Sequence, residues 1–194
     1  MATYSRKKEA RANKHFGFTT QIPRISETDM LDTIEAAVEA GEEPLILMLD
    51  RVQDPHNLGA ILRSADAAGV HFVIAPVKDA PAITETVRRI ACGGAERLPY
   101  VQVRNMNSVI RKLKDMHIHI IATSDHKGSV DLWEAQMTGS VAIIMGAEAT
   151  GVRRMSAELS DELIRIPMAG SVECLNVSVA TGVCLFEALR QRSE

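Results

Sequence analysis

The sequence has no apolar run approaching the roughly 20 residues that a membrane-spanning helix needs, and its first residues lack the apolar core of a secretion signal. Its three cysteines, Cys92, Cys174 and Cys184, are odd in number and far apart, which argues against a disulfide framework. They form no CxxC and have no His pair near them, so a zinc site is not indicated. We therefore expect a cytoplasmic protein with no membrane segment, no bound metal and three small buried thiols.

The sequence also lacks the GxGxxG fingerprint of dinucleotide-binding proteins. The spacing of Gly59 and Gly69, which follow an apolar run, does not fit that pattern. A dehydrogenase that uses a nicotinamide cofactor is therefore disfavoured.

What the sequence does contain is ordinary for a globular protein with one core. Of 194 residues, 46% are hydrophobic and 24% are charged. The formal net charge is −3, but Lys and Arg dominate the first 24 residues, where Glu9 is the only acidic residue. We interpret residues 1–25 as a basic flexible arm able to follow a phosphate backbone, and a simple solvated tail explains the same pattern equally well.

Residues 26–43 are predicted to form a linker helix. Ser26 is a typical N-cap with Asp29 three residues later, and apolar residues recur on one face as far as Gly41. From Pro44 onward, continuous apolar runs alternate with helical segments. Strands are expected at residues 45–49, 72–75, 118–122, 141–145 and 163–166, and helices at 58–68, 82–91, 108–116 and 157–162, before a long C-terminal helix. This order predicts an α/β fold with a doubly wound, mostly parallel sheet.

Three polar loops follow predicted strand ends, at residues 54–69, 144–152 and 166–176. Ligands of doubly wound sheets bind at the carboxyl ends of the strands, so we expect these loops to converge on one edge. In the first loop, Asn57 is a plausible N-cap, and Arg63 either pairs with Asp66 or leaves room for a phosphate among its small neighbours. In the second loop, Glu148 either caps a turn or orients a ligand hydroxyl or an arginine.

Motifs in these loops resemble those of the SpoU (TrmH) branch of the SPOUT RNA methyltransferases. They read NLGAxxR from Asn57 to Arg63, IMGxExxG from Ile144 to Gly151, IPMxG from Ile166 to Gly170, and LNVSVA from Leu175 to Ala180. The resemblance covers residues 45–192 and is closest to members that methylate a guanosine ribose in large-subunit ribosomal RNA. It implies a deep trefoil knot in the C-terminal half, a homodimer, S-adenosylmethionine as methyl donor, and an RNA ribose 2′-hydroxyl as acceptor.

The resemblance also implies a role for individual residues. By position, those expected to bind the methyl donor are Thr123, Gly146, Ile166, Met168 and Leu175, and those expected to form the catalytic cluster are Asn57, Arg63, Glu148 and Asn176. A guanidinium stays protonated in proteins. We therefore expect Arg63 to bind the adjacent phosphate and stabilise the developing alkoxide, while the proton leaves through phosphate, water or His56.

The sequence departs from the family pattern at two places. Cys174 stands where many relatives carry Ser, and residues 1–43 do not read as the separate RNA-binding domain that precedes the catalytic domain in close relatives. We expect residues 44–194 to form the catalytic domain and ribosomal RNA to be the substrate, with transfer RNA as the alternative. A noncatalytic, knotted RNA-binding protein is the alternative from another class. The C-terminal helix carries apolar residues on more than one face, which either a subunit interface or burial as a central helix within one subunit would explain.

Overall fold

Buried apolar runs form the central strands of a parallel sheet. The computed structural model describes residues 25–126, 128–148 and 150–193, so the expected basic arm lies almost entirely outside the described residues. The sheet has seven strands in the order β3-β2-β1-β6-β4-β7-β5, and every pairing is parallel. The strands are β1 (Leu45–Asp50), β2 (Phe72–Pro76), β3 (Tyr100–Val103), β4 (His119–Thr123), β5 (Val130–Asp131), β6 (Val141–Gly146) and β7 (Glu162–Arg165).

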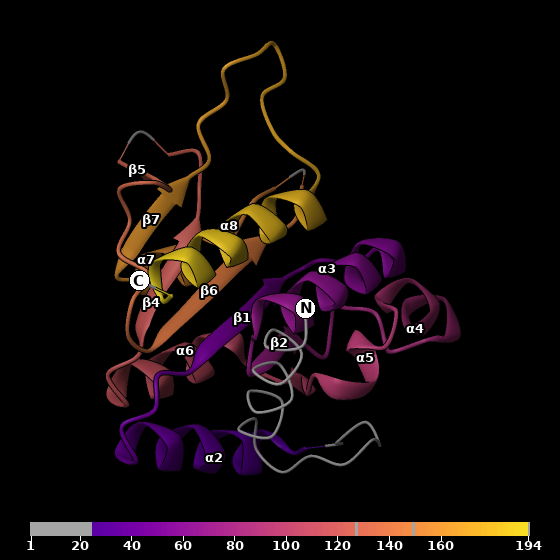
Figure 1. The fold of residues 1–194 in the computed structure, drawn as a ribbon, viewed down its shortest axis with the longest axis vertical. Helices are drawn as coiled ribbons and strands as arrows, with labels where there is room; N and C mark the ends of the chain where they lie inside the picture. Colours follow the sequence, from indigo (N-terminus) through magenta and orange to yellow (C-terminus); the bar gives the residue numbers. More distant parts are fainter. Residues whose placement is uncertain (1–24, 127, 149, 194) are drawn as a thin grey trace, which may run out of the picture.

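Helices cover both faces of this sheet (Figure 1). They are α2 (Glu27–Glu39), α3 (Pro55–Ala68), α4 (Glu85–Ala91), α5 (Gly94–Arg97), α6 (Met106–Asp115), α7 (Arg154–Leu159) and α8 (Val177–Gln191). Successive side chains of a strand point to opposite faces. Leu45 and Leu47 of β1 accordingly pack with α3, α4, α5 and α8, whereas Ile46 and Met48 pack with α2 and α6. The α/β fold with a parallel sheet is confirmed, and the trefoil knot stays a prediction.

The helix predicted after Ser26 is present as α2. The Ser26 side chain accepts a hydrogen bond from the Asp29 N–H, as an N-cap should. Met30 and Ile34 are fully buried in the same core as Ile46 of β1. The helix α2 therefore shares the core of the sheet. Within the described part of the chain, no helix combines the length and apolar character needed to cross a bilayer.

Several predicted elements need correction. Asn57 is not an N-cap: Asp54 caps α3 by accepting from the His56 N–H, and Pro55 follows at the first helical position, where its missing N–H costs nothing. The helix predicted at 157–162 is α7, which begins three residues earlier and ends before β7 joins the sheet. The edge strands β3 and β5 were not predicted, because neither is a continuous buried apolar run.

The cysteines do not all lie in the core. Cys184 is fully buried in α8, and burial raises the pKa of its thiol to about 12. Cys92 and Cys174 are exposed, so the prediction of three buried thiols is wrong for these two. Their positions explain this: Cys92 ends α4 with φ +50°, and Cys174 lies in the loop before α8.

Candidate active site

The three polar loops meet at one edge of the sheet, as predicted. The order of the strands reverses between β1 and β6: β1, β2 and β3 lie on one side of this point, and the remaining strands lie on the other. Such a switch point opens a crevice at the carboxyl ends of the strands. The helix α3 follows β1, the loop 147–153 follows β6, and the long loop before α8 follows β7 (Figure 1). Side chains from all three segments contact one another there.

Asn176 lies at the centre of these contacts. It caps α8, with its side-chain oxygen accepting from the N–H of Ser178 at 2.9 Å and from the Ser178 hydroxyl at 2.6 Å. Its amide nitrogen donates to Asn57 Oδ1 at 3.0 Å and to Glu148 Oε1 at 2.5 Å. Asn176 therefore has no spare hydrogen-bonding group of its own, and it fixes Asn57 and Glu148 relative to each other.

Glu148 is anchored by the start of α8. In addition to the Asn176 amide, its Oε1 accepts from the backbone N–H of Val177 at 3.0 Å. A carboxylate at a helix N-terminus is stabilised by the free N–H groups and the helix dipole. Among the described residues, no hydrogen bond is made by Glu148 Oε2 or by the Asn57 amide nitrogen. One acceptor and one donor are thus left for a ligand.

Arg63 is not part of this contact network. Residues six apart in an α-helix lie about 9 Å apart along its axis and roughly 120° apart around it, which separates Arg63 from Asn57. The Arg63 side chain is exposed and makes no hydrogen bond or ion pair with a described residue. Asp66, its possible partner from the sequence, pairs instead with Arg97. The structure therefore brings together three of the four expected catalytic residues.

A cavity of about 420 Å³ lies beside the Asn57, Glu148 and Asn176 cluster. All five residues expected to bind the methyl donor line it, namely Thr123, Gly146, Ile166, Met168 and Leu175. Glu148 and Cys174 line it too. The Thr123 hydroxyl donates to the Ile144 carbonyl at 3.2 Å, so Thr123 forms part of the wall rather than a free donor. The size and the mixture of apolar and polar groups are typical of a small-molecule site.

Gly146 allows the wall of the cavity to fold tightly. The loop after β6 closes on itself through the Gly151 N–H, which donates to the Ala147 carbonyl at 2.8 Å. A Cβ at position 146 would lie 2.1 Å from the Gly151 carbonyl carbon and 2.2 Å from the Val152 nitrogen. Because these are backbone atoms, only glycine fits here.

An ion-pair network that the sequence analysis missed holds the end of this loop. The backbone N–H of Arg153 donates to Asp50 Oδ2 at 2.8 Å. The Arg153 guanidinium lies 3.4 Å from Asp50 Oδ1 and 2.7 Å from Asp79 Oδ2. Asp50 is fully buried at the end of β1. A carboxylate that ends an apolar strand was the available signal, since a buried Asp requires a partner.

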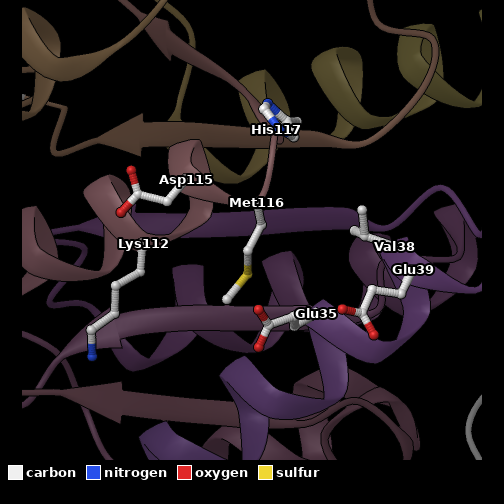
Figure 2. Close-up of a pocket in the computed structure, with 7 residues that line it drawn as sticks. All are labelled: Glu35, Val38, Glu39, Lys112, Asp115, Met116 and His117. Atoms are coloured by element: carbon white, nitrogen blue, oxygen red, sulfur yellow. The ribbon is translucent and has the colours of Figure 1, made fainter.

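A second cavity, of about 360 Å³, lies between α2 and the end of α6 (Figure 2). It contains none of the expected site residues, and the carboxylate of Asp115 points away from those of Glu35 and Glu39. Within residues 25–126, 128–148 and 150–193, no group of three or more His, Cys, Asp or Glu side chains is placed to hold a metal ion. This cavity has no evident link to the three loops.

The fold and the loop cluster define an α/β protein with a small-molecule site at one edge of its parallel sheet, and comparison with known proteins gives the family. The model of the SpoU rRNA Methylase family matches residues 44–186. The 23S rRNA (guanosine-2'-O-)-methyltransferase RlmB of Photobacterium profundum is 48% identical over 187 residues, which are 95% of this chain and 74% of the relative. RlmB of Escherichia coli K12 is 51% identical over 172 residues, or 88% of this chain and 68% of the relative. The chain belongs to the SpoU rRNA methylase family.

Solved structures agree with this assignment. An RNA 2'-O ribose methyltransferase superposes with a TM-score of 0.70 at 35% identity, over 78% of this chain and 58% of that one. The SpoU methyltransferase AviRb from Streptomyces viridochromogenes, in complex with AdoMet, gives 0.71 at 31% identity, over 77% and 60% of the two chains. The A. aeolicus TrmH/SpoU tRNA modifying enzyme gives 0.72 at 32% identity, over 86% and 84%. This chain thus spans about three fifths of the length of the first two.

Proposed function

We propose that the protein transfers a methyl group from S-adenosylmethionine to the 2′-hydroxyl of a guanosine ribose in RNA, with 23S ribosomal RNA as the substrate. The observation that carries this proposal is that Glu148, held by Asn176 together with Asn57, lines the same cavity as all the expected donor-binding residues. The RlmB relatives, about half identical to this chain, support guanosine in 23S rRNA as the target.

The residues of the cavity fit the methyl donor. Ile166, Met168 and Leu175 supply an apolar surface for an adenine ring, and the close backbone turn at Gly146 supplies polar groups at its edge. S-Adenosylmethionine, when bound, supplies an electrophilic methyl group. The chain's own task is to hold the ribose oxygen in line with that methyl and to exclude water.

The catalytic cluster positions the ribose. Asn176 fixes Asn57 and Glu148, which leaves the Asn57 amide N–H groups and Glu148 Oε2 to bind polar groups of the nucleotide. We assign Arg63 to a phosphate of the RNA, because its guanidinium is exposed, pairs with no described residue and suits a bidentate contact with an anion. From there its charge stabilises the oxygen as the proton is lost.

Transfer RNA is the second candidate substrate. The A. aeolicus tRNA-modifying enzyme matches 86% of this chain, whereas the AviRb structure matches 77% of it. The greater identity to the RlmB proteins favours ribosomal RNA.

We further propose that the active form is a homodimer in the cytoplasm, and that residues 44–194 are its catalytic domain. Val179 and Phe186 of α8 are 52% and 50% exposed, which is high for apolar side chains on a central helix. An apolar surface of this kind is typical of a subunit interface. A cytoplasmic location follows from the proposed ribosomal RNA substrate.

The direct test is transfer of labelled methyl from S-adenosylmethionine to unmodified 23S rRNA and to bulk tRNA in parallel. We expect 2′-O-methylguanosine in the ribosomal RNA, and a loss of at least 100-fold in rate for Arg63→Ala, as for the removal of a transition-state donor. Label in tRNA alone would show that transfer RNA, and not 23S rRNA, is the substrate. Donor binding without label in either RNA would support the noncatalytic alternative.

A further inference from the structure

A second exposed arginine, Arg97 of α5, pairs with Asp66 of α3, three residues after Arg63. The glycine pair Gly93-Gly94 turns the chain from α4 into α5 and brings α5 against α3. A Cβ on Gly94 would lie 2.8 Å from the Leu62 carbonyl oxygen and 3.3 Å from the Arg63 Cα. The start of α5 is therefore in backbone contact with the helical turn that carries Arg63.

Arg97, at the end of α5, folds back over this contact. Its Nη2 lies 3.4 Å from the place that a Cβ on Gly93 would occupy, and its Nη1 lies 3.8 Å from Asp66 Oδ2. Asp66 follows Arg63 by three residues, so the two lie on the same side of α3, about 4.5 Å apart along the helix axis. Arg63 and the guanidinium of Arg97 are thus neighbours along α3.

The pairing of Arg97 with Asp66 is weak. The Arg97 side chain is 71% exposed, and a solvent-exposed ion pair at this distance contributes little. A phosphate offers a guanidinium two charged oxygens in the geometry of its own N–H groups. Arg97 can therefore exchange Asp66 for a phosphate at small cost.

We infer that Arg97 is a second phosphate-binding residue, which holds the RNA strand next to the phosphate bound by Arg63. This rests on the proposed function. Asn57, Arg63 and Arg97 then mark a path along α3 that leads away from the catalytic cluster. Arg97 contacts the backbone and not the reacting atoms, so it sets the affinity for RNA and not the rate of methyl transfer.

The test measures binding of the full-length protein to an unmodified 23S rRNA transcript, together with methyl transfer. For Arg97→Gln we expect RNA binding about tenfold weaker, the loss of one charge-assisted contact. The slope of log K against log salt should fall by about 0.7, the value for one phosphate of a single strand. KM for RNA should rise by the same factor with kcat within twofold, and Arg97→Lys should recover most of the affinity because it keeps the charge.

Arg111→Gln is the matched control. Arg111 is exposed on α6, across the sheet from α3, and makes no ion pair with a described residue. Its substitution should leave RNA affinity within twofold of the wild type. Unchanged donor binding in each variant shows that the fold is intact.

Asp66→Asn separates the two ways in which Arg97→Gln could act. If Arg97 binds phosphate, the double variant with both Asp66→Asn and Arg97→Gln keeps the reduced slope of log K against log salt. Full recovery of wild-type affinity and slope in the double variant would overturn the inference, because Arg97 would then only mask Asp66. Equal affinities for wild type and Arg97→Gln would overturn it as well. Wild-type protein that binds the RNA but transfers no methyl would refute the proposed function, while these binding measurements would still decide the role of Arg97.

Discussion

Glu148 connects two loops through a single carboxylate oxygen, which accepts from the Asn176 amide and from the Val177 N–H at the start of α8. Glu148→Gln removes the charge that faces the helix N-terminus and gives the side chain a donor of its own. We expect kcat for methyl transfer to fall about 10- to 100-fold, because small misplacements of reacting groups cause rate losses of this size. Single-turnover transfer at saturating donor and RNA measures this step.

Glu158→Gln is its control, because Glu158 is an exposed residue of α7 that pairs with Arg154. Its single-turnover rate should match that of the wild type. A Glu148→Gln protein as fast as the wild type would remove Glu148 from the catalytic cluster.

Asp50 secures the loop after β6 from inside the sheet. Asp50→Asn breaks its pairing with Arg153 and leaves that guanidinium without its buried partner. Arg153 is itself 39% exposed, so we expect a loss of about 2 kcal/mol in the free energy of unfolding, below the cost of breaking a fully buried pair. Urea unfolding provides the measurement.

Asp79→Asn removes the other carboxylate that contacts Arg153. Its side chain is 43% exposed, so the substitution should cost less than about 1 kcal/mol. Equal costs for the two variants would show that burial of Asp50 has no role in holding the loop.

At the scale of elements, the turn between β6 and α7 depends on the absence of a side chain at position 146. Gly146→Ala places a methyl group within 2.2 Å of two backbone atoms, so the turn must open. We expect at least a tenfold loss of affinity for S-adenosylmethionine, since the turn forms the cavity wall. Isothermal titration calorimetry measures it.

Gly170→Ala is the matched control, since a Cβ there would have no atom within 4 Å. It lies in the long loop before α8, two residues after Met168 of the cavity wall, and does not itself line the cavity. Similar affinities for the two variants would contradict the role assigned to the turn.

The sequence predicted those elements whose own residues determine them. The central strands are continuous apolar runs, and Ser26 and Asn176 are N-caps with the side-chain geometry expected of them. The strand β3 was missed because it alternates buried and exposed side chains at the sheet edge. Within the first loop, Asp54 caps α3 and Pro55 is its first residue, so the helix starts three residues earlier than a helix capped by Asn57 would. That shift leaves the Asn57 side chain available to contact Asn176.

The candidate site was predicted from motif positions and not from contacts. The cavity lined by Gly146 and Leu175 therefore agrees with the sequence analysis, whereas the pairing of Asp50 with Arg153 needs residues 103 apart in the chain and leaves no local pattern. Arg97 is a similar case. Its proximity to Arg63 depends on how closely α5 packs on α3, which only the packed structure reveals.

At the scale of the whole molecule, Asp161, between α7 and β7, contacts Lys114 of α6 and His119 and Ile120 of β4. Partial burial tends to raise the pKa of Asp161, but hydrogen bonds from Lys114 and the Ile120 N–H, with the charges of Lys114 and His119, outweigh it and lower that pKa below its ordinary value. A lowered pKa in the folded state stabilises the protein above the unfolded pKa, near 4, and that stability is lost as the pH falls through the folded pKa.

Asp161→Asn should therefore cost about 1 kcal/mol in the free energy of unfolding at pH 7, since the pair is partly exposed. The difference from the wild type should shrink as the pH falls from 5 to 3. Urea unfolding at several pH values checks this, and a difference that stays constant over that range would contradict the assignment to Asp161.

The face of α8 that packs in the core is not its only apolar face. Cys184, Leu185 and Ala188 are fully buried, whereas Val179 and Phe186 are half exposed. Residues seven apart lie on one side of a helix, so Val179 and Phe186 form one outward face. The helix is apolar on both sides, as a helix between two subunits would be.

If the proposed homodimer uses this face, a charge placed on it must weaken association. Val179→Asp buries an unpaired carboxylate in the interface, and we expect the dimer dissociation constant to rise at least tenfold. Val77→Asp is the matched control, because Val77 is 53% exposed against 52% for Val179 but lies beyond β2, away from α8. Sedimentation equilibrium at micromolar concentration distinguishes the outcomes. Wild-type protein that is monomeric there would refute the dimer, and a Val179→Asp dimer as tight as the wild type would move the interface to another surface.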